Sequence, residues 1–555
     1  MIRTIPAPGP CWAGRAAAAR AGALALMLAV VGAARAAGAQ GSSTVLGGRP
    51  GDWSFASVAS EEENYMRVLQ VAGIARLRPW SIRPFAPGEL AALLPDSARH
   101  PWASRSRFAR GGGVRATVFG PGGALAYNSG FPLSMNDGAV WTGRGLTAIA
   151  TAGAAARWGA LSVRLEPVAF WSANRPVPLV PNGYTGAPRF GDALNPYNID
   201  APQRFGDRPY ARLDPGQSTV RLDLLGVAVG ATTANGWVGP AIADPLVLGN
   251  NAAGYPRLFA GTARPLRMPL GTVHLRVDAG RLDQSAYSTA APDSTRRLGS
   301  SVALVVTPGF SPGLEVGGVR YFHQAWNGWG RLGPGLKAAT AGFFIPGDQD
   351  AVPQNQLSSV FARWVFPEAG AEVWGEYMRN DASANSRDLA VEPDHNAGWM
   401  VGTRRVWRRP SGALVSARLE HLDTRVTHLA ALRVQTRPYE HNELRQGHTS
   451  RGEVLGSFSG QGGLATTAGV DVYVPDGRWT FEVSRRTRQS SLRNDAAYRA
   501  WDVYQILRAE RLRAAAVGDL FAGASGVWEL NRDFGKDAYS LRLDLGIRLA
   551  GRRVR

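Results

Sequence analysis

The chain has 555 residues, including 67 Gly, 36 Pro and a single Cys, so a disulfide framework and a cysteine-based zinc cluster are both excluded. Basic residues outnumber acidic residues by 62 to 43, which gives a formal net charge of +19, and only Lys337 and Lys536 among them are lysines. Hydrophobic residues make up 45% of the chain and aromatic residues 9%, which is enough apolar material for a large folded body.

The first 39 residues have the features of a secretory signal peptide. A basic start is followed by the apolar run 21–32 (AGALALMLAVVG) and by small residues that end in Ala37-Gly38-Ala39. This order predicts export and cleavage after Ala39, which would also remove Cys11. The apolar run is shorter than the roughly 20 residues of a spanning helix, so an uncleaved membrane anchor is the less favoured alternative.

Residues 40–110 differ in composition from the rest of the chain. Glu61-Glu62-Glu63 forms an acidic patch, and the segments 65–69 and 87–94 have helical patterns, the second with Pro87 at its first turn. We interpret this part as a small, partly helical N-terminal region that is periplasmic or plugs the mouth of a barrel. A flexible linker is the alternative.

From residue 111 to residue 555 the recurring pattern is alternation of apolar and polar side chains. In the segment 539–549 the apolar residues share one parity, while Ser540, Arg542, Asp544 and Arg548 fall on the other. A period of two places the two sets on opposite faces of a sheet. Further alternating segments start near Val114, Leu161, Val220, Val273, Val302, Leu314, Leu357, Ala371, Met400, Val415, Thr467 and Trp479.

Two architectures use such alternation, a soluble β-sandwich and a transmembrane β-barrel. Many segments reach the roughly nine residues that a tilted strand needs to cross a bilayer, and aromatic residues such as Trp364, Trp407 and Tyr539 lie near segment ends. No fixed repeat indicates a solenoid or a propeller. We therefore predict an all-β, antiparallel outer-membrane barrel of about 16 to 18 strands over residues 111–555. Its long loops are expected at 172–217, 231–268, 284–297, 325–355 and 379–396.

Several motifs occur in the order found in one known family. The segment from Asn235 reads NGWVGPAIADPLVLGNNAAGYPRLFAG, and it resembles the capsule assembly Wzi family. The positions that carry the resemblance are Trp237, Gly239, Pro240, Leu248, Asn251, Ala252 and Pro256, then Asn355-Gln356-Leu357 with Ala362-Arg363-Trp364, Glu376-Tyr377 with Asn380-Asp381, Glu392-Pro393-Asp394-His395, and His448 with Arg451-Gly452 and Leu455-Gly456. Val238 stands where the family has a second aromatic residue, and the tail 551–555 lacks a terminal aromatic residue.

The resemblance implies an outer-membrane barrel that holds capsular or related surface polysaccharide at the cell surface without catalysis. Its expected partners are that polysaccharide, outer-membrane lipid and lipopolysaccharide, and the barrel-insertion machinery. Arginine can hold acidic groups of such polymers bidentately, and aromatic rings can stack on sugars. The candidate polysaccharide-binding residues are Tyr184, Arg189, Tyr197, Trp237, Asn251, Tyr255, Arg257, Trp326 and Trp329. The alternative is that these arginines meet lipopolysaccharide phosphates and that the aromatic residues form an interfacial belt.

Other functions are weighed against this one. A porin-like channel would share the alternation and is the main alternative function. An enzyme is less favoured, because His448 and Ser450 supply residue types for a nucleophile and a base but sequence adjacency does not supply their geometry. None of the eight His forms a zincin-type metal pair, so we expect no metal and no cofactor. No basic module indicates nucleic-acid binding.

Overall fold

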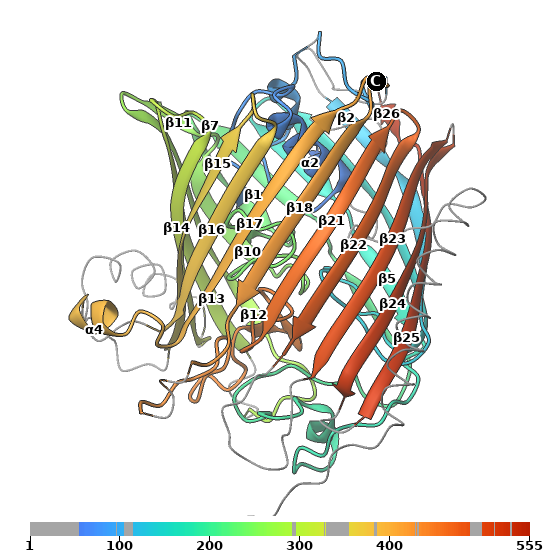
Figure 1. The fold of residues 1–555 in the computed structure, drawn as a ribbon, viewed down its shortest axis with the longest axis vertical. Coiled ribbons are helices and arrows are strands. Elements are labelled where there is room, and N and C mark those ends of the chain that lie inside the picture. The colour runs from blue at the N-terminus through green and yellow to red at the C-terminus, as the bar shows by residue number, and fades with distance from the viewer. Residues whose placement is uncertain are drawn as a thin grey trace, which may run out of the picture.

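The computed structural model shows a closed barrel of eighteen antiparallel strands, drawn from the side in Figure 1. The prediction of a transmembrane barrel is therefore confirmed. The structure describes residues 55–95, 97–104, 115–290, 296–326, 328, 354–381, 386–427, 429, 432–488, 502–515, 517–532 and 536–554. The predicted signal peptide and most of the predicted loop 325–355 lie outside these residues. No helix of the described part is both long and apolar enough to cross a membrane.

Some of the eighteen strands are continuous and others are made of two pieces. In chain order they are β2 (Arg115–Asn128), β3 (Gly145–Trp158), β4 with β5 (Leu161–Leu165, Val168–Ser172), β6 with β7 (Tyr210–Asp214, Thr219–Leu224), β8 (Val227–Thr232), β10 with β11 (Arg257–Thr262, Leu266–Met268), β12 (Gly271–Asp283), β13 (Arg296–Pro308), β14 (Leu314–Ala325), β15 (Gln354–Phe366), β16 (Ala371–Asn380), β17 (Ala397–Arg408), β18 (Leu414–Asp423), β21 (Leu464–Val474), β22 (Gly477–Thr487), β23 (Val503–Ala515), β24 (Gly518–Arg532) and β25 with β26 (Lys536–Leu549, Arg552–Val554). The shorter elements are α2 (Glu61–Val71), η2 (Leu90–Leu93), η3 (Ala187–Phe190), α4 (Ser386–Val391), β1 (Ile82–Arg83), β9 (Trp237–Val238), β19 (Thr449–Ser450) and β20 (Glu453–Val454).

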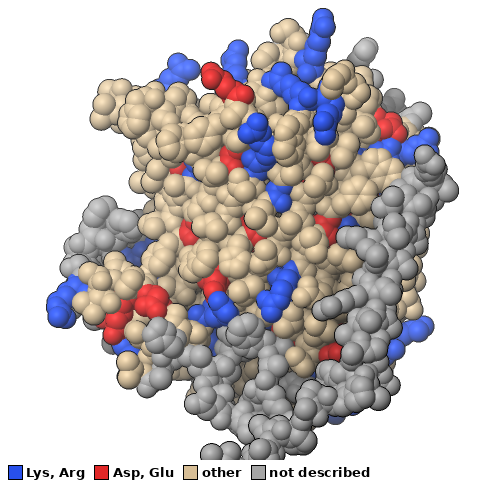
Figure 2. Space-filling view, viewed as in Figure 1, with Lys and Arg blue, Asp and Glu red and all other residues tan. Residues whose placement is uncertain are grey.

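The two faces of each strand meet different surroundings, as β25 illustrates. Leu545 is 57% exposed on the outer surface, whereas Arg542 and Arg548 are buried inside. Apolar side chains thus face outward and charged ones are enclosed, which is the arrangement of a barrel in lipid and the inverse of a soluble protein. The outer face in Figure 2 is accordingly made mostly of uncharged residues, and Lys and Arg gather toward the upper rim in that view.

The barrel has two unlike ends. Short connections, such as 159–160 between β3 and β4 and 475–476 between β21 and β22, lie at the end that we call the turn end, near the C-terminus at the top of Figure 1. Long connections, including 129–144, 173–209, 233–256 and 424–463, lie at the opposite end, which we call the loop end. Strand β26 extends the last strand and pairs with the start of β2.

The N-terminal region occupies the turn end of the barrel interior. The side chain of Ser60 caps α2 by accepting a hydrogen bond from the Glu63 backbone N–H, and three glutamates form the first helical turn. The Trp102 indole N–H donates to the Val474 carbonyl, 3.0 Å away, at the β21–β22 turn. The residues of α2 share an apolar cluster with inward-facing Val365, Val406 and Tyr473 of the wall.

Candidate functional site

Two segments that enter from opposite ends meet inside the barrel. Strand β1 of the N-terminal region pairs antiparallel with β9, which belongs to the loop-end connection 233–256. The Arg83 guanidinium lies 4.5 Å from the centroid of the Trp237 ring, and Trp237 is only 2% exposed. Because both segments reach this sheet, the interior between the two ends is occupied by protein.

The three glutamates of the first turn of α2 each pair with a different arginine. Glu61 binds Arg478 of β22 at 2.6 Å and Glu62 lies 3.3 Å from Arg548 of β25. Glu63 lies 3.4 Å from Arg83. All three carboxylates are buried, so the acidic patch seen in the sequence is an internal anchor of the N-terminal region. Burial raises the pKa of Glu62 to about 7.

One turn further along, α2 is tied to the wall by a chain of alternating charges. Arg67 donates to Glu372 of β16 at 3.1 Å, and Arg363 of β15 donates to the same carboxylate at 2.6 Å. Arg363 also pairs with Glu315 of β14 at 2.9 Å. The other oxygen of Glu315 accepts the backbone N–H of Trp80 at 2.7 Å. These fully buried pairs fix the orientation of the N-terminal region.

The inward course of the connection 233–256 depends on one carboxylate. Glu420 of β18 accepts the consecutive backbone N–H groups of Ile242, Ala243 and Asp244 at 2.7, 2.9 and 2.7 Å. Asp244 in turn pairs with Arg486 of β22 at 2.5 Å. Buried backbone N–H groups need hydrogen-bond acceptors, and this carboxylate supplies one for three of them.

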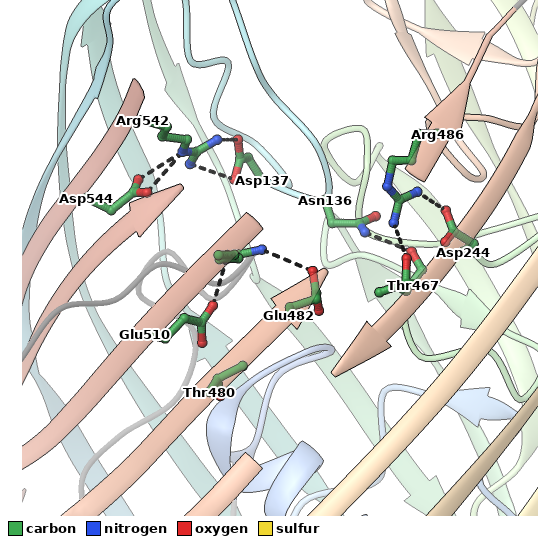
Figure 3. Close-up of polar contacts among 12 residues, drawn as sticks. Asn136, Asp137, Asp244, Thr467, Thr480, Glu482, Arg486, Glu510, Arg542 and Asp544 are labelled. Carbon is green, nitrogen blue, oxygen red and sulfur yellow. Dashed lines mark hydrogen bonds and ion pairs between the residues drawn. The ribbon is translucent and has the colours of Figure 1, made fainter. Parts of the chain in front are cut away.

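A cavity of about 130 Å³ remains between this connection, α2 and the wall. Figure 3 shows its charged lining: Arg542 lies between Asp137 and Asp544, Arg486 contacts Asp244 and Thr467, and Glu482 and Glu510 face the same guanidinium. Arg508 is an arginine that contacts both of these carboxylates, with Nη1 4.0 Å from Glu482 and Nε 2.9 Å from Glu510. The volume suffices for on the order of ten water molecules. Each of these three cations faces a carboxylate, but the whole lining holds seven arginines against five carboxylates, so the cavity is a polar interior with an excess of positive charge.

Four of the predicted polysaccharide-binding residues lie in the interior. Trp237 packs under Arg83, and Arg257 donates to Asp278 at 3.0 Å. The hydroxyl of Tyr255 accepts from the Tyr321 hydroxyl at 3.0 Å, and the Asn251 amide donates to the Val454 carbonyl at 3.2 Å. All four predicted residues are less than 9% exposed, so they hold the loops rather than present themselves outside.

Three other predicted residues lie on the outer surface of the loop 173–209. Tyr197 is 49% exposed, and the Arg445 guanidinium stacks 3.6 Å from its ring centroid. Arg189 is exposed, lies 4.8 Å over Phe190 and makes a weak contact of 3.5 Å with Asp207. Tyr184 is also exposed on this loop. The structure thus brings exposed aromatic rings and guanidinium groups together at the loop end.

The last two predicted residues follow β14. Trp326 is half-buried, and its backbone N–H donates to the Arg296 carbonyl at 3.1 Å. Trp329 lies outside the described residues.

The loop end also contains a pocket of about 160 Å³ that the sequence did not predict, which we call the loop-end pocket. Its walls come from the connections 129–144, 173–209 and 424–463 and from the loop-end parts of β23 and β24. Trp141 and Phe205 form one aromatic pair with centroids 5.0 Å apart, and Phe458 and Tyr504 form another at 5.7 Å. Of the predicted residues, Asn251 alone lines it.

The residues considered for catalysis do not form a nucleophile–base pair. His448 lies with Nε2 2.6 Å from the Val247 carbonyl oxygen and with Nδ1 2.8 Å from Nε2 of His323. Both ring nitrogens are therefore engaged by groups other than Ser450, which lies in the short strand β19. Burial lowers the pKa of His448 to about 4, so the ring is neutral. Within the described residues, no group of three or more His, Cys, Asp or Glu side chains could hold a metal ion.

Known proteins resemble this chain in fold more than in sequence. The search of curated proteins found no match. Among solved structures, the outer-membrane protein Wzi of Escherichia coli, described as a carbohydrate-binding β-barrel involved in group 1 capsule assembly, has a TM-score of 0.57 and 13% identity, covering 88% of this chain and 98% of that one. OccAB1 of Acinetobacter baumannii and OprD of Pseudomonas aeruginosa have TM-scores of 0.38 and 0.39 and identities of 10% and 9%. Each alignment covers 80% of this chain, and the two cover 97% of the OccAB1 chain and 94% of the OprD chain.

The family comparison covers most of the barrel. The family model described as capsule assembly protein Wzi matches residues 126–517, which is more than half of the chain and includes β9, the loop 173–209 and most of the lining of the loop-end pocket. The chain is therefore an outer-membrane β-barrel that belongs to the Wzi capsule assembly family.

Proposed function

We propose that the protein binds capsular or related surface polysaccharide at its loop end and anchors it at the cell surface without catalysis. The observation that carries the proposal is the exposed Tyr197 ring of the loop 173–209, on which Arg445 of the connection 424–463 stacks. Arg189 of the same loop is also exposed and lies over the buried ring of Phe190. The Tyr197 ring offers a flat apolar surface for a sugar ring, and the two guanidinium groups offer donors for hydroxyl, carboxylate or phosphate groups. Membership of the capsule assembly family supports the same function.

The occupied interior favours binding over conduction. A porin-like channel requires a continuous aqueous path, whereas here the β1–β9 sheet and the Glu420-bound turn lie across the interior. The apolar outer belt would contact acyl chains, and arginines near the rims would meet the phosphates of lipid or lipopolysaccharide. Barrel-insertion machinery would be the partner during assembly.

The test uses the full chain, purified in detergent, and the polysaccharide from the surface of the source organism. We expect Tyr197→Ala and Arg189→Ala each to weaken binding at least tenfold. Trp158→Ala is the matched control, because Trp158 is 71% exposed but lies at the turn end. In cells that lack the native protein, the first two variants should release polysaccharide into the medium and the control should retain it. Equal binding by all three variants and the parent protein would contradict the proposal.

A further inference from the structure

The loop-end pocket combines features that suit a sugar ring. Its two aromatic pairs, Trp141 with Phe205 and Phe458 with Tyr504, come from connections that are far apart in sequence but converge on one hollow. The first pair is buried and forms a floor, whereas Phe458 is half-buried at the edge. Pockets that bind small ligands are typically lined by apolar and aromatic surfaces with a few placed polar groups.

The polar groups of the pocket are more often acidic than basic. Its lining includes the carboxylates of Asp192, Glu453, Asp502 and Glu529, against the guanidinium groups of Arg488 and Arg532. Arg532 is paired with Glu529, so it is not free to neutralise a ligand carboxylate. The pocket therefore lacks the surplus of positive charge that recognition of an acidic sugar requires.

Two lining atoms lack a hydrogen-bond partner among the described residues. These are Oδ1 of Asp502 and Nε of Arg488, whose guanidinium lies 4.5 Å over the Phe458 ring. Burial, with the neighbouring Glu529, raises the pKa of Asp502 to about 8, so its carboxyl group is protonated at neutral pH. A buried polar atom without a partner is costly, and a sugar hydroxyl can satisfy either a donor or an acceptor.

We infer that the loop-end pocket binds a single uncharged sugar residue, neutral or N-acetylated, of the polysaccharide, with Phe458 as a stacking wall and Asp502 and Arg488 as its hydroxyl partners. The inference rests on the proposed function and adds specificity to it. Acidic units of the polymer, where present, bind at the exposed arginines of the loop 173–209. The volume of about 160 Å³ suits one ring rather than a length of polymer.

The test compares uncharged and acidic trisaccharides. Maltotriose, cellotriose, chitotriose (N-acetylated) and trigalacturonic acid are titrated into the detergent-solubilised full chain by calorimetry. We expect at least one uncharged trisaccharide to bind at least tenfold more tightly than trigalacturonic acid. Phe458→Ala should weaken that binding at least tenfold, Asp502→Asn should change it less than threefold because the amide still donates, and Trp158→Ala should leave it unchanged.

Three results would overturn the inference. They are trigalacturonic acid binding as tightly as every uncharged probe, the absence of binding by all uncharged probes, and equal affinities for Phe458→Ala and Trp158→Ala. Retention of the folded barrel by Phe458→Ala is checked by the faster migration of the unheated protein on a denaturing gel. Binding of the native polysaccharide by the parent protein separates the two proposals. If the polysaccharide binds but no uncharged trisaccharide does, only the pocket inference is rejected. If an uncharged trisaccharide binds in the pocket but the polysaccharide does not bind, only the proposed function is rejected.

Discussion

Arg478 of β22 and Glu61 of α2 form a two-point ion pair across a sequence separation of 417 residues. Nη2 of Arg478 lies 2.6 Å from Oε1 of Glu61, and its Nε lies 3.0 Å from Oε2. Arg478 also meets Asp471 at 3.2 Å and Glu510 at 3.0 Å, so it joins the N-terminal helix to three wall strands. The pair therefore attaches the first described helix to strands in the C-terminal half of the barrel.

The first prediction concerns this pair. Glu61→Gln should lower the free energy of unfolding by about 1–3 kcal/mol, because a buried guanidinium loses one charged partner but keeps two others. Guanidinium titration in detergent measures the effect. Asp207→Asn is the control, since its contact with Arg189 is exposed and such pairs contribute at most about 1 kcal/mol. An equal effect of the two substitutions would show that the buried pair does not anchor the helix.

The second prediction concerns conductance. In a planar bilayer we expect the parent protein to show only small conductance, because the β1–β9 sheet and the turn bound to Glu420 occupy the interior. The triple variant Glu61→Gln, Glu62→Gln and Glu63→Gln should open larger and less steady currents, since each glutamate pairs with a separate arginine. Large steady currents through the parent protein would instead favour the porin-like alternative.

The third prediction separates buried from exposed aromatic residues. Trp237→Ala should destabilise the protein by about 3–5 kcal/mol, because it removes a buried ring from beneath Arg83 and enlarges the cavity that both residues line. Tyr197→Ala should change the free energy of unfolding by less than about 0.5 kcal/mol while weakening polysaccharide binding. Unfolding curves and binding isotherms for the same two preparations give both quantities. If Trp237→Ala weakened binding without loss of stability, Trp237 would have to be accessible to the ligand.

The sequence predicts the barrel well wherever the two faces of a strand differ strongly. The alternating segments proposed from the sequence coincide with barrel strands, and 539–549 lies in β25 with the expected outward leucines. Strand β3 was not among them. Its sequence GLTAIATAGAAARW places mostly Ala on one face and Gly, Thr, Ile, Ala and Arg on the other, so the period of two carries little contrast although the strand pairs along its length with β2.

The candidate site could be predicted only in part. Sequence alone places Trp237 in a long connection, but it cannot show that the connection turns inward, because the carboxylate that holds it belongs to Glu420, 176 to 178 residues away. The loop-end pocket is also formed by residues that are far apart in the sequence. Trp141, Phe205 and Phe458 belong to three different connections, and no local pattern marks them as neighbours.

The fourth prediction uses His100, which lies beside the helix that occupies the turn end. Nδ1 of His100 is 3.1 Å from the Tyr65 hydroxyl, and the Tyr65 ring packs at a tilt with its centroid 4.2 Å from that of Trp102 and 4.8 Å from that of Tyr473 of the wall. Burial lowers the pKa of His100 to about 4, from an ordinary value near 6.5. Between these two values the unfolded chain binds a proton that the folded chain does not.

Folding stability should therefore fall as the pH decreases from about 6.5 to about 4, and it should be unaffected by this group above pH 7. The contribution of His100 is about 1–3 kcal/mol, reduced from the full linkage value because the ring is partly exposed. Unfolding free energies of the parent protein and His100→Gln, each measured at pH 7.5 and pH 4.5, isolate it, because other titrating groups contribute equally to both. The parent protein should lose more stability than the variant on acidification. A parallel loss in the two proteins would mean that His100 remains protonated in the folded state and does not couple the N-terminal region to pH.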